Sequence, residues 1–276
     1  MSTSSFRLAQ RLFSDVDLAF VTSNEQRRRS DLNELRLSLV HDEQLRSDVL
    51  GDERLFQRVL NLDDAFIRIS PRLFFEILLR RAVLELSKAV YIREWEGGDR
   101  VPVFIGDREV RPVGTPSVID YLSDMLASFT KINNHTARVR VRRGVWRKNR
   151  YSDLDVPSLL RLASETDEAD RLSVYKRAAD ASLLILGVFP DFATSATHHP
   201  GTGALRRRGA RLSTEEYEHV AAKVYKLAAE HPSADEWFSD VASTLSNHVI
   251  DAKRPLNHLA ARFLRLRRGE FFALGE

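Results

Sequence analysis

One segment, from Ser70 to Trp95, constrains the fold of this chain more than any other. Between Leu73 and Val90, apolar side chains occupy nearly every position and leave only a narrow polar stripe. Ser70 can cap the helix N-terminus, and Pro71 fits the first helical position, where its missing N–H has no consequence. A helix that is apolar on most sides has to be buried. The sequence therefore predicts a central helix around which the rest of the chain packs.

The polar stripe of this helix carries two pairs of opposite charge, Glu76–Arg80 and Arg81–Glu85. Each pair is four residues apart, the spacing at which side chains meet on a helix surface. We interpret these charges as structural ion pairs rather than catalytic groups. They also interrupt the longest apolar run, so that no segment reaches the ~18 residues of a membrane span. We therefore expect no membrane contact.

Composition excludes several classes of protein. The 276 residues contain no cysteine, which rules out disulfides, thiolate catalysis, zinc fingers and cysteine-ligated iron–sulfur clusters. The N-terminal sequence has no basic cluster followed by an apolar core, so we expect a cytoplasmic protein rather than a secreted one. Of 42 basic residues 35 are arginine, which indicates a GC-rich bacterial genome or a preference for phosphate and carboxylate partners.

The rest of the chain has a mostly helical pattern. Residues 1–70 carry short apolar runs at helical spacing, and residues 167–187 indicate a longer helix that ends at a glycine. Capping boxes at Ser213–Glu216 and Ser233–Glu236 each predict the start of a helix. Asp180 lies among apolar neighbours, where it either lines a pocket with Ser182 or, as we prefer, pairs with an arginine.

Two segments predict β-hairpins. Val101–Val110 would turn at Gly106-Asp107, with Pro102 placing its first strand at an edge, and His135–Tyr151 is a second, very basic hairpin. The predicted fold class is mostly α: a multi-helix globular fold around a buried central helix, with two small β-hairpins. We treat residues 1–276 as a single helical domain that can be sub-divided into an N-terminal helical part (1–134), the basic hairpin (135–155) and a C-terminal helical part (156–276).

The stretch Tyr175-Lys-Arg-Ala-Ala-Asp-Ala-Ser-Leu-Leu-Ile-Leu-Gly-Val-Phe-Pro-Asp191, followed by Tyr217–Tyr225, resembles a pattern found in prokaryotic helical proteins of unknown function. The shared part is the C-terminal half of the chain. The resemblance implies a coherent helical fold, and it implies no activity, cofactor or partner.

The basic segment, residues 138–150, is the strongest candidate for a functional site. Seven of its 13 residues are basic, and no acidic residue occurs from Lys131 to Ser152. Because successive strand residues point to opposite faces, the arginines at even positions from 138 to 142 would cover one face and the valines between them the other. The candidate nucleic-acid-binding residues of the basic segment are Arg138, Arg140, Arg142, Arg143, Trp146, Arg147, Lys148 and Arg150.

Cations at this density repel one another unless something negative is near. A two-stranded ribbon fits the major groove of DNA, and phosphate neutralisation supplies most non-specific affinity. Trp146 and Tyr151 are available to stack on a base or sugar, or to pin the ribbon to the protein. The alternative is internal or subunit pairing of the arginines with the acids that follow, which are Asp153, Asp155, Glu165, Asp167 and Glu168.

A loop at His198–Arg211 is the second candidate. Its glycines can let backbone amides surround a phosphate, but their spacing is not that of a P-loop. We interpret it as a surface loop that supplies an auxiliary nucleic-acid contact through Arg206, Arg207, Arg208 and Arg211.

Other motifs argue against specific alternatives. In a winged-helix arrangement the residues from Ser117 to Thr130 would enter the groove, yet Asp120 and Asp124 would repel phosphates there. The eight histidines are scattered and form no metal-binding motif, and no nucleophile motif is present. We therefore expect no metal, no cofactor and no catalytic residue, and we favour a protein that is not an enzyme.

These observations favour a non-enzymatic nucleic-acid-binding protein that contacts phosphates, or another polyanion, through the basic segment. The alternative is a helical scaffold or interaction protein whose arginines bind an acidic protein partner or a second subunit, which would make it a homo-oligomer. A third class, an enzyme acting on phosphorylated substrates, would use the same arginines but lacks an evident acid or base. The two leading classes differ in whether the basic segment meets phosphates or carboxylates.

Overall fold

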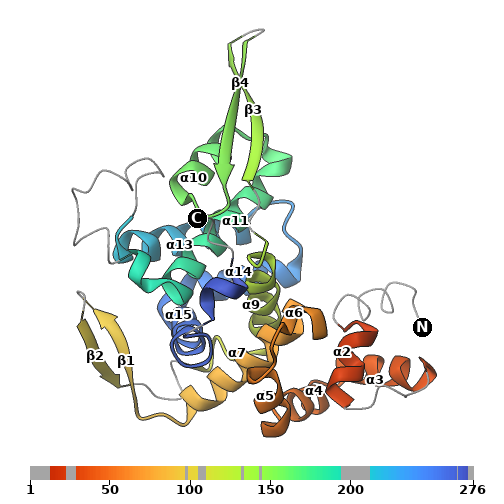
Figure 1. Cartoon of the computed structure of the whole chain (residues 1–276). Coiled ribbons are helices and arrows are strands. Elements are labelled where there is room, and N and C mark those ends of the chain that lie inside the picture. The colour runs from red at the N-terminus through yellow and green to blue at the C-terminus, as the bar shows by residue number, and fades with distance from the viewer. Residues whose placement is uncertain are drawn as a thin grey trace. The chain divides into compact units, whose positions relative to one another are not determined.

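The computed structural model describes residues 13–22, 29–96, 99–104, 110–131, 134–142, 145–193, 212–265 and 267–272, with only the backbone described at 29–31, 92–96, 99–100, 104, 134–142 and 145–151. The fold is mostly helical, which confirms the mostly α part of the predicted fold class (Figure 1). None of the helices in these ranges is long and apolar enough to cross a membrane.

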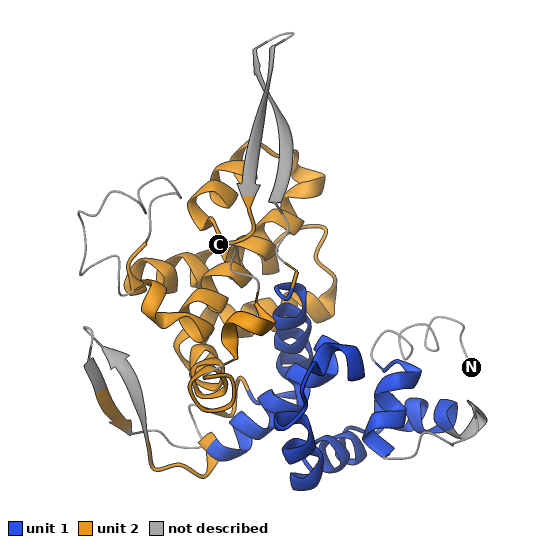
Figure 2. Ribbon diagram, viewed as in Figure 1, with its two compact units in different colours: residues 1–85, 114–130 blue, residues 86–113, 131–276 orange. Residues whose placement is uncertain are grey.

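The chain divides into two compact units, which are coloured separately in Figure 2. Unit 1 comprises residues 1–85 and 114–130, and unit 2 comprises residues 86–113 and 131–276. Unit 1 is therefore built from two stretches of chain that are separated in sequence. The single helical domain over 1–276 and its sub-divisions at residues 134 and 155 stay predictions.

Unit 1 is a set of helices around one buried helix. Its elements are α2 (Asp15–Thr22), α3 (Arg29–His41), α4 (Glu43–Leu50), α5 (Glu53–Leu60), α6 (Ala65–Arg68), α7 (Pro71–Ser87) and α9 (Pro116–Ser128).

The buried helix is α7, and it begins as the sequence predicts. Pro71 occupies its first position, and the Ser70 hydroxyl accepts a hydrogen bond from the backbone N–H of Leu73 at 3.2 Å. Every residue from Leu73 to Leu79 is at most 1% exposed. The predicted central buried helix is confirmed over this stretch.

The C-terminal end of that prediction is wrong. The helix ends at Ser87 instead of Trp95, and Val90 is 70% exposed. The residues that follow, Tyr91–Glu96, form strand β1. Their aromatic and β-branched side chains favour a strand, and this local preference outweighs the continuation of the helical apolar pattern.

Unit 2 contains the remaining helices and four strands. Its helical elements are α10 (Val156–Glu165), α11 (Glu168–Val188), α13 (Thr214–Ala229), α14 (Glu236–Asn247), α15 (Val249–His258), the π-helical turn η2 (Leu259–Phe263) and α16 (Arg268–Phe271).

The centre of unit 2 is the second half of α11. All residues from Ala178 to Val188 are buried, and the helices α10, α13 and α15 pack against α11. At Gly187 the approach of α15 is so close that a Cβ atom would lie 2.4 Å from the Cβ of Leu256. Glycine is therefore required there by packing and not by its backbone angles.

Two helix starts in unit 2 test the capping predictions. At α13 the Ser213–Glu216 capping box is confirmed, since both reciprocal hydrogen bonds are present. At α14 the prediction of a Ser233–Glu236 box is wrong. Asp235 caps that helix instead, accepting a hydrogen bond from the Phe238 N–H at 2.7 Å. A carboxylate one residue before the helix reaches the first-turn amides directly.

The strands form two antiparallel pairs. The first joins β1 (Tyr91–Glu96) to β2 (Asp99–Phe104), and the second joins β3 (Asn134–Arg142) to β4 (Val145–Ser152).

The hairpin predicted at Val101–Val110 is wrong in its bounds, because the strand that begins this segment pairs with the strand before it in the sequence. The residues 101–104 form the second strand of a pair with 91–94, and the predicted turn at Gly106-Asp107 lies outside the described residues. In the sequence, Gly97-Gly98 between two β-prone runs is the turn signal that matches this pairing. The second predicted segment, His135–Tyr151, overlaps β3 and β4, and its arginine-covered face stays a prediction.

Truncating the core of α7 tests the assignment of the central helix. Leu78 is fully buried, so Leu78→Ala should lower the free energy of unfolding by about 2–5 kcal/mol. Ile67→Ala is the matched control in the same unit, because Ile67 is 79% exposed and its truncation should change stability by at most about 0.5 kcal/mol. Urea denaturation measures both, and equal midpoints would contradict the assignment.

Candidate functional site

The predicted site residues fall into two groups in the structure. Arg138, Arg140 and Arg142 belong to β3, and Trp146, Arg147, Lys148 and Arg150 belong to β4, where the backbone is described. The other predicted residues lie outside the described residues, and they are Arg143, Arg206, Arg207, Arg208 and Arg211.

The backbone register of β3 and β4 gives the arrangement of the first group. Arg138 is paired with Lys148, and Arg140 is paired with Trp146, before an irregularity between Arg140 and Arg142. Residues directly opposite one another in an antiparallel pair are close neighbours on one face. The register therefore places three basic residues and one aromatic residue in two neighbouring positions of the strand pair.

The end of β4 is tied to the helices of unit 2 by carboxylates. Asp153 follows the last strand residue, is only 2% exposed, and pairs its Oδ2 with Nη2 of Arg177 in α11 at 2.6 Å. Asp155 caps α10, accepting from the Ser158 N–H at 3.2 Å and from the Ser158 hydroxyl at 2.6 Å. Residues 152–155 thus form a defined connection, which we call the ribbon root.

These contacts bear on the internal salt-bridge alternative. Asp153, Asp155 and Glu168 are three of the five acids that the alternative assigns to the basic segment. Each has a described partner on a helix: Asp153 pairs with Arg177, Asp155 accepts from Ser158, and Glu168 pairs with Arg171 in α11 at 2.5 Å. Acids near the basic segment in sequence therefore contribute to the helical body of unit 2.

The most extensive polar cluster of unit 1 is one that the sequence did not predict as a whole. The polar stripe of α7 places Arg72, Glu76 and Arg80 at successive four-residue steps. Glu76 is fully buried; its Oε2 lies 2.9 Å from Nη1 of Arg72, and its Oε1 lies 3.0 Å from Nε of Arg80. The predicted Glu76–Arg80 pair is confirmed, and so is Arg81–Glu85 at 2.7 Å.

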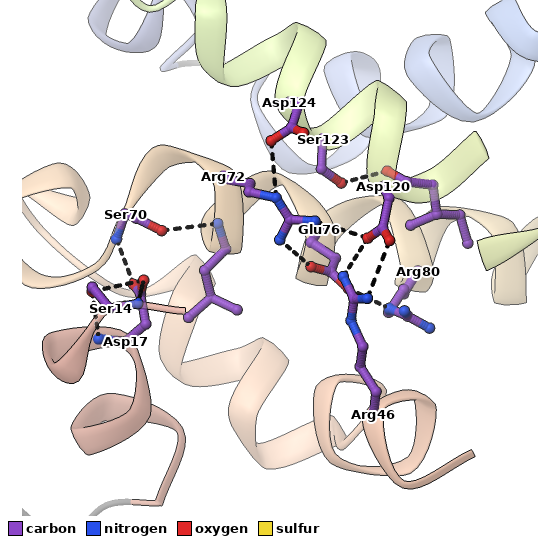
Figure 3. Close-up of polar contacts among 12 residues, drawn as sticks. Ser14, Asp17, Arg46, Ser70, Arg72, Glu76, Arg80, Asp120, Ser123 and Asp124 are labelled. Atoms are coloured by element: carbon purple, nitrogen blue, oxygen red, sulfur yellow. Dashed lines mark hydrogen bonds and ion pairs between the residues drawn. The ribbon is translucent and has the colours of Figure 1, made fainter. Parts of the chain in front are cut away.

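Two further helices join this cluster (Figure 3). Nη2 of Arg46, from α4, lies 2.7 Å from Oε1 of Glu76, and the same guanidinium binds Asp120 of α9. Arg72 also reaches α9, with contacts of 2.8 Å to Asp120 and 2.9 Å to Asp124. We call these six residues the ion cluster: Arg46, Arg72, Glu76, Arg80, Asp120 and Asp124.

The electrostatics of the ion cluster follow from its burial and its three cations. Burial by itself raises the pKa of the Glu76 carboxyl, but the charges of Arg72, Arg46 and Arg80 and the hydrogen bond from Arg46 outweigh it, so the net pKa lies below the ordinary value. For Arg46, burial opposes the charged form, and Glu76 and Asp120 reverse this, so its pKa is raised. Glu76 and Arg46 therefore stay ionised near neutral pH.

The ion cluster is therefore suited to structure rather than to chemistry. A carboxylate held ionised by three guanidinium groups is a poor proton donor or acceptor near pH 7. The same geometry explains why Asp120 and Asp124 occur in the segment that a winged helix would place in the DNA groove. Both acids pair with arginines of this unit, Asp120 with those of α4 and α7 and Asp124 with that of α7. The signal available in the sequence was the four-residue repeat of charges on an otherwise apolar helix.

A second polar contact fixes the N-terminal end of α7. The buried carboxylate of Asp17, in α2, accepts hydrogen bonds from the Ser70 N–H at 2.7 Å and from the Ser14 hydroxyl at 2.8 Å (Figure 3). A carboxylate at a helix N-terminus is favoured by the helix dipole. Asp17 therefore ties α2 to the start of the central helix.

The prediction for Asp180 needs correction. Its carboxylate pairs with Lys176 at 2.7 Å and accepts a hydrogen bond from the buried Tyr225 hydroxyl at 2.9 Å, where an arginine partner was expected. The lysine is one helical turn earlier on α11, and the tyrosine comes from α13. This contact joins two helices of the unit 2 core. The neighbouring Ser182 hydroxyl donates to the Ala178 carbonyl of its own helix.

Metal ligands and relatives give no further indication of function. Within the described ranges, no group of three or more histidine, aspartate or glutamate residues is placed to hold a metal ion. Comparison of the chain with protein-family models, with curated proteins and with solved structures finds no match. The functional argument therefore depends on the residues of this chain alone.

Neutralising Glu76 tests the ion cluster. Glu76→Gln should lower the free energy of unfolding by about 3–5 kcal/mol, because three buried guanidinium groups lose the carboxylate that they share. Glu53→Gln is the control: it removes a carboxylate that is 53% exposed and paired with Arg81, and it should change stability by at most about 1 kcal/mol. Urea denaturation of both variants measures the difference.

The pH dependence of the Glu76→Gln effect has a defined sign. Since the pKa of Glu76 is lower in the folded protein than its ordinary value of 4.5, its stabilisation is complete above about pH 4.5 and is lost as the pH falls through the folded-state pKa. The gap between wild type and Glu76→Gln should therefore narrow in acid. A gap that stays constant from pH 7 to pH 3 would contradict the assignment.

Proposed function

We propose that this protein binds nucleic acid without catalysing a reaction, and that it contacts phosphates through the basic segment, residues 138–150. The observation that carries the proposal is the density of positive charge in the sequence: seven cations in 13 residues, and no acidic residue from Lys131 to Ser152. Neutralisation of phosphates by arginine and lysine supplies most of the affinity in non-specific binding to nucleic acid.

The backbone pairing of β3 with β4 supports this proposal. Thr136, Arg138 and Arg140 alternate along β3, and their register partners are Arg150, Lys148 and Trp146. Since paired residues share a face, these six residues are expected to form one surface with four cations and an indole ring. Such a surface combines the charge that attracts a phosphate backbone with an aromatic group that can stack on a base.

Charge repulsion is the physical reason to expect an anionic partner. Like charges directly opposite one another in a strand pair destabilise it, and Arg138 lies opposite Lys148. A polyanion removes this repulsion and releases its own counterions at the same time. Binding and the order of the strand pair are therefore expected to favour each other.

The treatment of arginine elsewhere in the chain also supports the proposal. In unit 1, Arg46, Arg72 and Arg80 are each neutralised by carboxylates from the same unit. Near the basic segment, Asp155 is used to cap α10 and Glu168 pairs with Arg171. An external anion is consistent with this use of the available acids. The loop arginines at 206–208 and 211 would add an auxiliary contact.

The competing proposal is an interaction protein whose arginines bind an acidic protein surface or a second copy of the chain. Carboxylates on a protein are sparser than phosphates on a duplex, so fewer counterions are released and the dependence of affinity on salt is weaker. Affinity for a random-sequence duplex at several salt concentrations therefore separates the two proposals. Strong binding that weakens steeply with salt favours nucleic acid.

The decisive variant is Arg138→Ala, Arg140→Ala and Arg142→Ala combined. Each lost phosphate contact should reduce the slope of log affinity against log salt by about 0.9, so the triple variant should flatten it by nearly three. The matched control removes three exposed arginines elsewhere, Arg54, Arg68 and Arg161, and should leave the slope near that of the wild type. Filter binding at several salt concentrations measures both slopes.

The melting temperature of the same triple variant separates it from the internal salt-bridge alternative. Removing mutually repelling cations should leave the melting temperature unchanged or slightly higher. If the arginines instead neutralise acids of the fold, acids without partners should lower it. A triple variant that melts earlier, together with a wild type that shows no salt-dependent binding, would overturn the proposal.

A further inference from the structure

The ribbon root, residues 152–155, connects the basic segment to the helices of unit 2 through a buried charge. Asp153 is the first acidic residue after the basic segment, and its side chain is 2% exposed. Its partner Arg177 is 20% exposed and lies in α11, one residue before the fully buried half of that helix. The carboxylate therefore joins the end of β4 to the helix whose second half is fully buried.

Helix α10 holds the same root from its other side. The Asp155 N–H donates to the Ser152 carbonyl at 3.0 Å, and the Asp155 carboxylate caps α10 through Ser158. Val156 and Leu159 are buried at the start of α10, which packs against α11. Two helices thus fix the chain within three residues of the last strand position.

We propose that the Asp153–Arg177 ion pair is a positioning element that sets the direction in which the basic segment extends from the helices of unit 2, and so pre-orders it for a polyanion. This inference depends on the proposed function. Neither residue has to touch the ligand. A segment that is held in one direction loses less conformational entropy on binding than one that pivots at its root. Its affinity is higher because this entropic cost is smaller.

The sign of the expected effect separates positioning from simple electrostatics. Asp153 carries a negative charge beside a site for an anion, so charge alone predicts that removing it strengthens binding. Positioning predicts that removing it weakens binding. In either case the number of phosphates that the arginines neutralise is unchanged, and the slope of affinity against salt should stay that of the wild type.

The test uses Asp153→Asn and Arg177→Gln together, in the full chain. The double variant has the net charge of the wild type and replaces both members of the ion pair by neutral polar groups, so its melting temperature should stay close to that of the wild type. Its affinity for a random-sequence duplex should fall roughly tenfold, with an unchanged salt slope. The matched control, Lys226→Gln with Glu230→Gln, removes a pair that is 69% and 63% exposed and should leave affinity within about twofold.

A second measurement tests the orientation without nucleic acid. Because the chain contains no cysteine, spin labels can be attached at Asn149→Cys in β4 and Ser173→Cys in α11. The distance distribution between the labels should be narrow with Asp153 and Arg177 present and should broaden in the double variant. This readout does not depend on the ligand and detects a pivoting root directly.

The outcomes distinguish this inference from the proposed function. If the wild type shows no salt-dependent duplex binding, the proposed function is wrong, and the label distances alone then decide whether the ion pair orients the segment. If the wild type binds but the double variant binds within twofold of it, or if the distance distribution does not broaden, the positioning role is wrong and the proposed function stands. A tenfold loss with an unchanged slope and a broadened distribution supports both.

Discussion

The ionised carboxylate of Glu76 is the interaction on which the organisation of unit 1 depends. It lies in the polar stripe of a helix that is otherwise apolar, and three guanidinium groups converge on it. Two of those arginines continue to Asp120 on α9 (Figure 3), a helix more than 25 residues further along the chain. Apolar burial places α7 at the centre, but it is non-directional. The ion cluster adds direction, because each charge that is taken out of water requires a specific partner.

The proposed function gives arginine two different roles in this chain. Inside the units it is matched by acids, as Arg46 and Arg72 are by Glu76 and Asp120. In the basic segment the sequence supplies cations without acids, and the proposed function assigns their neutralisation to phosphates. The two roles meet at the ribbon root, where Arg177 holds Asp153 at the end of β4. In this account, the internal Asp153–Arg177 pair would hold the basic segment in position for an external anion.

Much of the helical architecture is predictable because it depends on local signals. The Ser70–Pro71 start of α7, its apolar core and the Ser213–Glu216 box each follow from residues within one or two turns. The errors arise where local signals compete, as at Tyr91–Glu96, where strand preference ends the helix. The ion cluster joins α4, α7 and α9, and the lysine and tyrosine partners of Asp180 could not be ranked against an arginine. Ion pairs between residues far apart in the chain leave no periodic pattern in a single sequence, so they cannot be predicted from it.

The central claim is that the arginines of this chain divide into those neutralised within the fold and those that await an anion. Hydrogen exchange at the arginine Nε–H groups, followed by nuclear magnetic resonance with and without a short duplex, tests it most directly. Arg46, Arg72 and Arg80 should be protected from exchange in both conditions, since all three side chains are buried and the Nε–H of Arg80 donates to Glu76. Arg138, Arg140 and Arg142 should exchange rapidly alone and become protected when the duplex is added. Protection of these three arginines before any duplex is present would contradict the account.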